Sequence, residues 1–329
     1  MNTMRAVRLH GVRDARLEVL DIPRPGPREL LVRIEACGVC PTDVRKYLIG
    51  VNDGSYPFNP GHEWFGRIAE LGAGVTGWQV GQRVYGDTYA GYAEYAVLGV
   101  DPKPWSYGPL AMPEDIPLDR AVFVEPLADC LHAIGDQAKL EPGERLAVVG
   151  AGQMGLQLAA AGALAGGLVH VIEPRAERRE LAMKLGAQAA SGPDDWPSAV
   201  RDWSGGAGAD VVVLSIGNPD LIGPAIKALA HRGRLVLFAG FGDRGEALVD
   251  VNRIHYKEMT IIGSEWVGVP PGDQRGRYEQ ARQLLADGTL ELEMLVSAHC
   301  GLDGVLGAFD DVSAQRVMKT VLLPGGLAR

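Results

Sequence analysis

The sequence predicts a two-domain α/β protein, with a β-rich first part followed by a doubly wound parallel sheet. Three observations support this prediction. The chain has 329 residues, which is longer than most single hydrophobic cores. Residues 4 to about 125 hold short alternating apolar runs that proline and glycine interrupt. From about residue 125, continuous apolar strands alternate with segments of helix length, which is typical of a parallel sheet between helices.

The first part reads as a small barrel or a folded sheet. Apolar residues alternate at 6–9 and 30–34, with a proline-rich break at 23–27 between them. Further strands are predicted at 80–84 and 89–97, and a helix is expected to begin near Val44. Short strands with interior glycines are typical of such a domain.

The second part opens with an apolar strand at 146–149, a glycine-containing loop and a helix of small residues. More strands are predicted at 168–172, 210–214, 234–238 and 259–262, and a helix at 177–185 that ends at Gly186. After about residue 265 the sequence predicts loops, one amphipathic helix at 277–286 and a closing strand at 318–323. We expect this tail to pack back on the first domain.

The amino-acid composition narrows the kinds of molecule that the protein is expected to bind. A net charge of −9 and a pI near 5.3 argue against nucleic acid or an anionic membrane. No run reaches the roughly 18 apolar residues that a membrane helix needs, and the N-terminus lacks the apolar core of a signal peptide. The four cysteines are too few and too scattered for a disulfide framework. We therefore expect reduced thiols and a cytoplasmic location.

The loop at 150–155 reads Gly-Ala-Gly-Gln-Met-Gly and matches the dinucleotide fingerprint. Gly150 would allow the tight turn, Gly152 would let the pyrophosphate approach the backbone, and Gly155 would let helix and strand pack closely. Gln153 and Met154 open the following helix, whose free N–H groups and positive dipole end suit phosphates. The sequence thus predicts a nicotinamide dinucleotide site at these five residues.

Glu173 ends the next predicted strand and is the candidate partner of the cofactor ribose. A carboxylate there can accept hydrogen bonds from both ribose hydroxyls and would repel a 2′-phosphate, so NAD is favoured over NADP. Arg175 and Arg178 lie close enough to keep NADP open, because an arginine accommodates that phosphate. The alternative for Glu173 is an ordinary solvated strand end.

A second set of residues precedes the glycine loop. Cys40 follows a predicted strand, His62 and Glu63 follow a turn-rich stretch, and Glu125 lies where the first part ends. A thiolate, an imidazole and carboxylates together suit a zinc ion that must also hold a substrate. Taken singly, each has a simpler explanation, since a lone cysteine is often a small buried hydrophobe and a histidine beside glutamate a surface pair.

The run from Gly61 to Val75, with glycines at 66 and 72, resembles the signature of the zinc-containing medium-chain alcohol dehydrogenases. Residues 38–43 are similar to that family's first-ligand motif. Glu125-Pro126-Leu127 resembles the segment at which the first domain of that family passes into the second. It has the form found in the polyol (sorbitol and threonine dehydrogenase-like) branch. The resemblance covers essentially the whole chain. It implies a GroES-like catalytic domain at 1–127 and 266–329, and a Rossmann NAD-binding domain at 128–265.

The resemblance implies one catalytic zinc held by Cys40, His62 and one or both of Glu63 and Glu125. Asp43 would orient His62 through its other ring nitrogen; its alternative role is to cap the nearby helix. The lobe that carries four cysteines in many relatives is missing here, so no structural zinc is expected.

The implied reaction is hydride transfer to NAD from a secondary alcohol of a polyol, sugar, cyclitol or hydroxy-amino compound. Thr42 is the expected first proton acceptor, with Glu63 or Glu125 as alternatives. Arg45 occupies the position where many relatives carry a proton-relaying histidine. Arginine does not deprotonate in proteins, so that relay is in question, and we expect Arg45 near the pocket.

The resemblance also implies a homodimer or homotetramer joined through the edge strand near 259–263. Two other classes stay open from the sequence. One is a zinc-free, NADPH-dependent quinone or enoyl reductase on the same fold, which would not need the metal ligands. The other is a non-catalytic nucleotide-binding protein.

Overall fold

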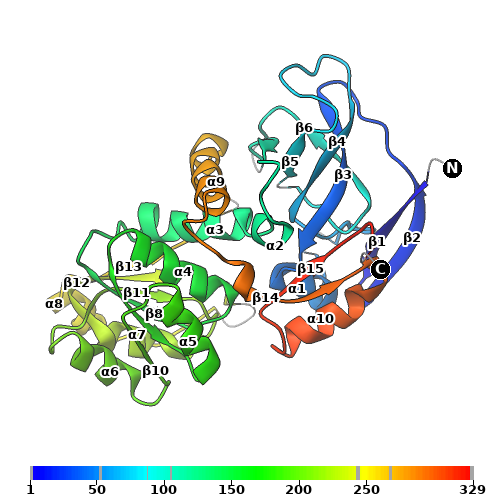
Figure 1. Cartoon of the computed structure of the whole chain (residues 1–329). Helices are drawn as coiled ribbons and strands as arrows, with labels where there is room; N and C mark the ends of the chain where they lie inside the picture. The colour runs from blue at the N-terminus through cyan, green and yellow to red at the C-terminus, as the bar shows by residue number, and fades with distance from the viewer. Residues whose placement is uncertain are drawn as a thin grey trace. The chain divides into compact units, whose positions relative to one another are not determined.

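The computed structural model describes residues 3–51, 54–86, 88–103, 106–241, 245–266 and 269–326. The chain forms two compact units (Figure 1). The first unit comprises Met1–Glu125 and Gly268–Arg329, and the second comprises Pro126–Val267.

The first unit is built on a seven-stranded sheet in the order β14-β15-β3-β4-β5-β7, with β6 paired to β3. A separate two-stranded sheet joins β1 and β2. Figure 1 shows the red strand β15 beside the blue strand β3, so the predicted return of the tail to the first domain is confirmed. The strands are β1 Thr3–Gly11, β2 Asp14–Asp21, β3 Glu29–Gly38, β4 Glu63–Leu71, β5 Arg83–Gly86, β6 Tyr95–Gly99, β7 Leu110–Ala111, β14 Val296–Cys300 and β15 Lys319–Leu322.

The helices of this unit are α1 Pro41–Ile49, α2 Leu118–Ala121, α9 Pro271–Ala286 and α10 Val305–Ser313, and α3 Val124–His132 runs on into the second unit. The tail was expected to hold loops, one helix and a closing strand, so the additional strand β14 and helix α10 correct that prediction. The buried residues of α10 are Val305, Ala308 and Phe309, which recur at helical spacing. Phe309 packs against Tyr47 of α1, with 5.2 Å between the ring centroids.

Several predicted boundaries were wrong by three or more residues, among them the starts of α9, at Pro271 rather than 277, and of β12 (Leu229–Leu237), at Leu229 rather than 234. Helix α1 begins at Pro41 rather than near Val44, because proline suits the first helical position, where no N–H bond is needed. Strand β5 begins only at Arg83, after Gly81 turns the chain at a φ of +87°. Strand β6 begins only at Tyr95, since the preceding amides at 90 and 91 donate to the carbonyl of Gly61 instead.

The second unit is a six-stranded sheet in the order β10-β9-β8-β11-β12-β13, and every neighbouring pair is parallel. The predicted doubly wound sheet is confirmed. Its strands are β8 Arg145–Val149, β9 Leu168–Ile172, β10 Ala189–Ser191, β11 Ala209–Leu214, β12 Leu229–Leu237 and β13 Thr260–Gly263. Its helices are α4 Gln153–Leu164, α5 Ala176–Lys184, α6 Trp196–Trp203, α7 Ile222–Ala228 and α8 Val251–Tyr256, with a π-helical turn at Ala133–Gln137.

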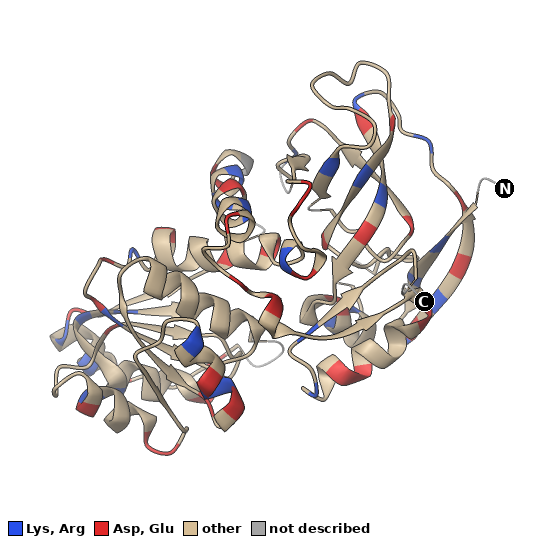
Figure 2. Ribbon diagram, viewed as in Figure 1, with Lys and Arg blue, Asp and Glu red and all other residues tan. Residues whose placement is uncertain are grey.

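The apolar strands that defined the second unit are buried. Residues Val211 to Leu214 of β11 are fully inaccessible, as the centre of a sheet covered on both faces requires. In Figure 2, acidic and basic residues are interspersed on both units in this view, in keeping with a mixed surface of modest negative charge. Within the described residues, no helix is both long enough and apolar enough to span a membrane.

Candidate active site

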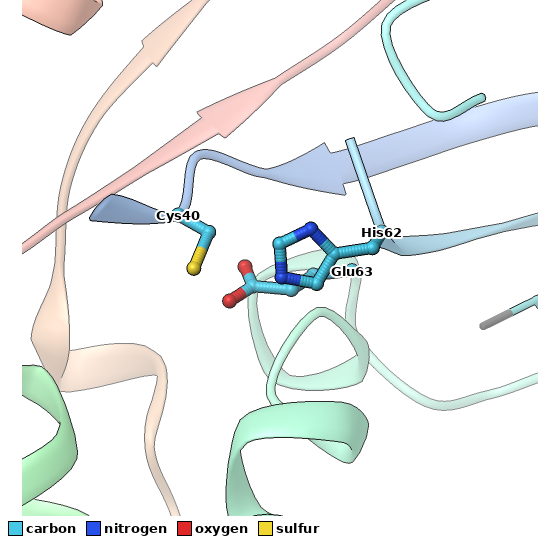
Figure 3. Close-up of side chains that lie close together, drawn as sticks. All are labelled: Cys40, His62 and Glu63. Carbon is cyan, nitrogen blue, oxygen red and sulfur yellow. The ribbon is translucent and has the colours of Figure 1, made fainter. Parts of the chain in front are cut away.

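Three of the predicted metal ligands converge in the first unit. Cys40 caps the N-terminus of α1, and His62 and Glu63 stand where β4 begins. One ligand atom from each lies within 4.8 Å of the other two. Figure 3 shows the sulfur, the imidazole ring and the carboxylate facing one another. Across the described ranges this is the one such group of three, and we call it the ligand group.

The donor chemistry of the ligand group fits a zinc ion, which takes sulfur, imidazole nitrogen and carboxylate oxygen. Oε1 of Glu63 is buried without a hydrogen-bond partner, a condition that native proteins seldom leave unmet. Nδ1 of His62 lies 3.4 Å from Oδ2 of Asp43, in poor hydrogen-bond alignment. That orientation leaves Nε2 of His62 as the nitrogen for a metal.

Asp43 lies beside His62 and is fully buried. Its carboxylate accepts a hydrogen bond from the backbone N–H of Gly61 at 3.0 Å and one from the Tyr92 hydroxyl at 3.4 Å. The N-cap of α1 is Cys40, whose sulfur accepts from the Thr42 N–H at 3.4 Å, so the capping alternative for Asp43 is wrong. The carboxylate instead fixes the chain just before His62.

The charges of the ligand group influence one another. Burial raises the pKa of the Cys40 thiol, and the Glu63 carboxylate adds to that effect. Burial opposes protonation of His62, but Asp43 and Cys40 outweigh it and hold the pKa of the imidazole well above its usual value. A thiolate is therefore disfavoured at Cys40 unless a further cation compensates it, which is what a bound zinc ion would do.

Glu125 is not a member of the ligand group, but the charges of that group affect the pKa of its carboxyl. Burial raises the pKa of Glu125 to about 7, with His62 lowering it and Glu63 raising it. Its backbone N–H donates to the Tyr85 hydroxyl at 3.3 Å. Glu125 is thus placed near the ligand group without completing it.

The two other candidate catalytic residues lie on α1. Thr42 and Arg45 are both exposed, Thr42 two positions from Cys40. The next residue, Lys46, is half-buried, and its Nζ lies 5.1 Å from the ring centroid of Tyr89. Tyr89 in turn lies 4.9 Å from the His62 ring, centroid to centroid.

Neither Lys46 nor Tyr89 was among the residues predicted from the sequence. Lys46 was not predicted, because only its neighbour Arg45 occupies the position where many relatives carry a proton-relaying histidine. Tyr89 lies in the 89–97 run that was interpreted as a strand. The isolated Gly91 inside this run was the available signal that a regular strand is interrupted there.

The glycine loop of the second unit has the form that the fingerprint predicts. Gly150 has a φ of +97°, and a Cβ at Gly155 would stand 1.9 Å from the Gly150 carbonyl oxygen. Gly152 is the N-cap of α4, and a Cβ there would meet nothing within 4 Å. Gln153 and Met154 form the first turn of α4. Gly150 and Gly155 are therefore needed for the fold, whereas Gly152 borders open space.

Glu173 is buried at the end of β9, so the alternative of a solvated strand end is wrong. Its Oε2 accepts from the Ala151 N–H at 2.9 Å, and its Oε1 accepts from the Arg175 N–H at 3.1 Å. The carboxylate thus ties the glycine loop to the strand that follows it. Arg178 is partly buried on α5, and desolvation followed by the charge of Arg175 lowers the pKa of its guanidinium.

Comparison with known proteins places these two units in a family. Residues 26–107 match the alcohol dehydrogenase GroES-like domain, and residues 140–287 match the zinc-binding dehydrogenase domain. An L-threonine 3-dehydrogenase of Caldanaerobacter subterraneus is 29% identical, over 85% of this chain and 92% of its own. The sorbitol dehydrogenase of Bacillus subtilis is 26% identical over 93% of each.

The fold is also similar to that of solved dehydrogenase structures. The 2R,3R-butanediol dehydrogenase from Bacillus subtilis superposes with a TM-score of 0.86 at 25% identity, over 98% of this chain and 99% of that one. A Sinorhizobium meliloti structure described as a zinc-binding dehydrogenase bound to NADP gives 0.87 at 25% identity, over 98% and 100%. With both domain models matched in order and the ligand group assembled, the chain belongs to the zinc-binding medium-chain alcohol dehydrogenases.

Proposed function

We propose that this protein is a zinc-dependent oxidoreductase that transfers hydride from a secondary alcohol to NAD. The observation that carries the proposal is the ligand group, Cys40, His62 and Glu63, in a chain whose other unit holds a dinucleotide loop. Cys40, His62 and one or both of Glu63 and Glu125 would hold the metal. Zinc, when bound, supplies a Lewis acid that lowers the pKa of a substrate hydroxyl.

The remaining roles belong to residues beside the ligand group. Thr42 is the proposed first proton acceptor, because its hydroxyl belongs to the residue whose N–H bonds to the Cys40 sulfur. Asp43 orients His62 from the side of its Nδ1 atom. Arg45 and Lys46 supply positive charge on α1, which suits a substrate with an acidic group or several hydroxyls.

Polyols, sugars, cyclitols and hydroxy-amino compounds are the proposed substrates. The names of the relatives, which act on threonine, butanediol and sorbitol, support this choice. The test is metal analysis of the purified protein, followed by a panel of these alcohols with NAD, read at the NADH absorbance band. One zinc per chain and turnover of at least one vicinal diol or amino alcohol are expected. A protein without zinc, or one that turns over none of the panel, would refute the proposal.

We propose NAD as the preferred cofactor, with Glu173 as the residue that sets the preference. Replacing Glu173 with alanine removes the carboxylate that would repel a 2′-phosphate, while Arg175 and Arg178 remain. The ratio of kcat/KM with NADP to that with NAD is expected to rise by at least about tenfold, the effect of one lost charge interaction of roughly 1.4 kcal/mol. Glu177→Ala, which removes a nearby carboxylate in the first turn of α5, is the control. An unchanged ratio in the Glu173 variant would contradict the assignment.

A homo-oligomer is proposed through the edge strand β13. Among the residues that the structure describes, this strand pairs with β12 alone, and it leaves a row of backbone groups for a second copy. Leu248, Val251 and Tyr256 nearby in the sequence are exposed apolar residues, as is Ile261 on the strand itself. Analytical ultracentrifugation is expected to show a dimer or tetramer, and Ile261→Lys is expected to shift it toward monomer. A wild-type monomer at micromolar concentration would exclude this interface.

A further inference from the structure

One member of the ligand group, Glu63, forms a buried ion pair. Nζ of Lys319, on β15, pairs with Oε2 of Glu63, and both side chains are inaccessible to solvent. The same ammonium lies 5.6 Å from the ring centroid of Phe123. One oxygen of the carboxylate is therefore committed to the lysine, whereas the other, Oε1, has no hydrogen-bond partner. Burying two charges is unfavourable unless their surroundings compensate it, so the pair calls for an explanation.

The backbone leaves room for this pair at Gly38. Gly38 faces Glu63 across β3 and β4, and it faces Val321 across β3 and β15. A Cβ at Gly38 would lie 2.1 Å from Oε2 of Glu63 and 2.8 Å from Nζ of Lys319. The space of the missing side chain is thus filled by the ion pair, where three strands meet. The arrangement is built into the sheet rather than formed by a mobile surface side chain.

We propose that Lys319 is a positioning residue that shares the Glu63 carboxylate with the metal. It holds Oε2 and leaves Oε1 to the ion, and it retains the carboxylate when the ion departs. The inference rests on the proposed zinc site. It concerns how tightly that site keeps its metal and how much of the carboxylate charge the metal receives.

Two effects of Lys319 act in the same direction on metal release. Its positive charge offsets part of the negative charge that Glu63 brings to the ion, which weakens the hold on the metal. It also keeps Glu63 paired after release, so that no uncompensated buried carboxylate remains. Removing the ammonium should therefore slow metal release. An ordinary supporting partner acts in the opposite sense, since its loss usually weakens metal affinity by about 10–100-fold. The sign of the effect separates the two roles.

The experiment follows release of zinc from the loaded full-length protein into an excess of chelator. Lys319→Met is expected to release zinc roughly tenfold more slowly than wild type, at the lower end of what neighbours of metal ligands contribute. Lys319→Arg, which keeps the charge, is expected to release at nearly the wild-type rate. Lys103→Met is the matched control, because Lys103 is an exposed lysine of the same unit. In a Glu63→Gln background, the Lys319→Met change is expected to have no effect on release.

Faster release or a lower zinc content in Lys319→Met would show that the lysine only supports the fold, and would overturn the inference. An equal effect of Lys319→Met with and without Glu63 would overturn it as well. If Lys319→Met does not fold, Lys319→Gln removes the charge while keeping a hydrogen bond to Glu63, and it carries the same prediction. Zinc content of the wild type is measured first. A zinc-free wild type refutes the proposed function, whereas zinc-loaded wild type with unaltered release in the variant refutes only the role of Lys319.

Discussion

Cys40→Ser is expected to yield a folded protein that has lost its zinc and its turnover. The thiolate is the soft ligand of the ligand group, and a serine hydroxyl is a poor substitute because it stays protonated at neutral pH. Loss of the ion removes several kcal/mol of stabilisation from the transition state. At about 1.4 kcal/mol per factor of ten, kcat/KM should fall by at least roughly 10³-fold. His62→Ala should give the same result by removing the imidazole.

The measurements are zinc per chain, turnover and circular dichroism on the same preparations. Cys300→Ser is the matched control, since Cys300 is a half-buried thiol on β14 of the same unit and belongs to no ligand group in the described residues. It is expected to keep both zinc and activity. If Cys40→Ser retained zinc and full turnover, the assignment of the metal site would fail, whatever the fate of His62→Ala.

The fold of the second unit could be predicted from the sequence because the patterns that indicate it are local. An apolar strand, a glycine loop and a carboxylate at the end of the next strand follow one another within about thirty residues. In the structure Gly155 lies against the Gly150 carbonyl, and the N–H of Ala151 donates to Glu173, in the order that the sequence predicted. Periodicity of two or of 3.6 is similarly local, so five of the six parallel strands were predicted, although β12 begins earlier than expected and the short β10 was missed.

The environment of the ligand group could not be predicted in the same way. Cys40, His62 and Glu63 stood out because their spacing forms a motif, but Lys319 is 256 positions away from the carboxylate that it contacts. The available hint was a lysine in the closing strand 318–323, where alternation would suggest an apolar residue. A charge at a core position implies a buried partner. It does not say which partner, and only the pairing of β15 with β3 brings the two together.

Gly155 and Gly152 are expected to have different roles, the first in packing and the second in cofactor binding. Replacing each with alanine should show this difference. A methyl group at position 155 would stand 1.9 Å from the Gly150 carbonyl oxygen, so either the loop or α4 must shift. Backbone cannot yield as a flexible side chain does, and overpacking of this kind usually destabilises by about 1–3 kcal/mol or more. We expect Gly155→Ala to lower the free energy of unfolding by roughly that amount and to weaken NAD binding as a consequence.

Gly152→Ala should show the reverse pattern, because a methyl group at position 152 would touch nothing within 4 Å and the φ of −69° suits any residue. Its stability should stay within about 0.5 kcal/mol of wild type, as for a substitution that disturbs no contact. The added methyl group would nevertheless occupy the space through which a pyrophosphate approaches the backbone. NADH affinity, measured by fluorescence titration, should then fall at least about tenfold, a loss of roughly 1.4 kcal/mol. Wild-type affinity in this variant would place the cofactor elsewhere, and wild-type stability in Gly155→Ala would contradict the close packing of loop and helix.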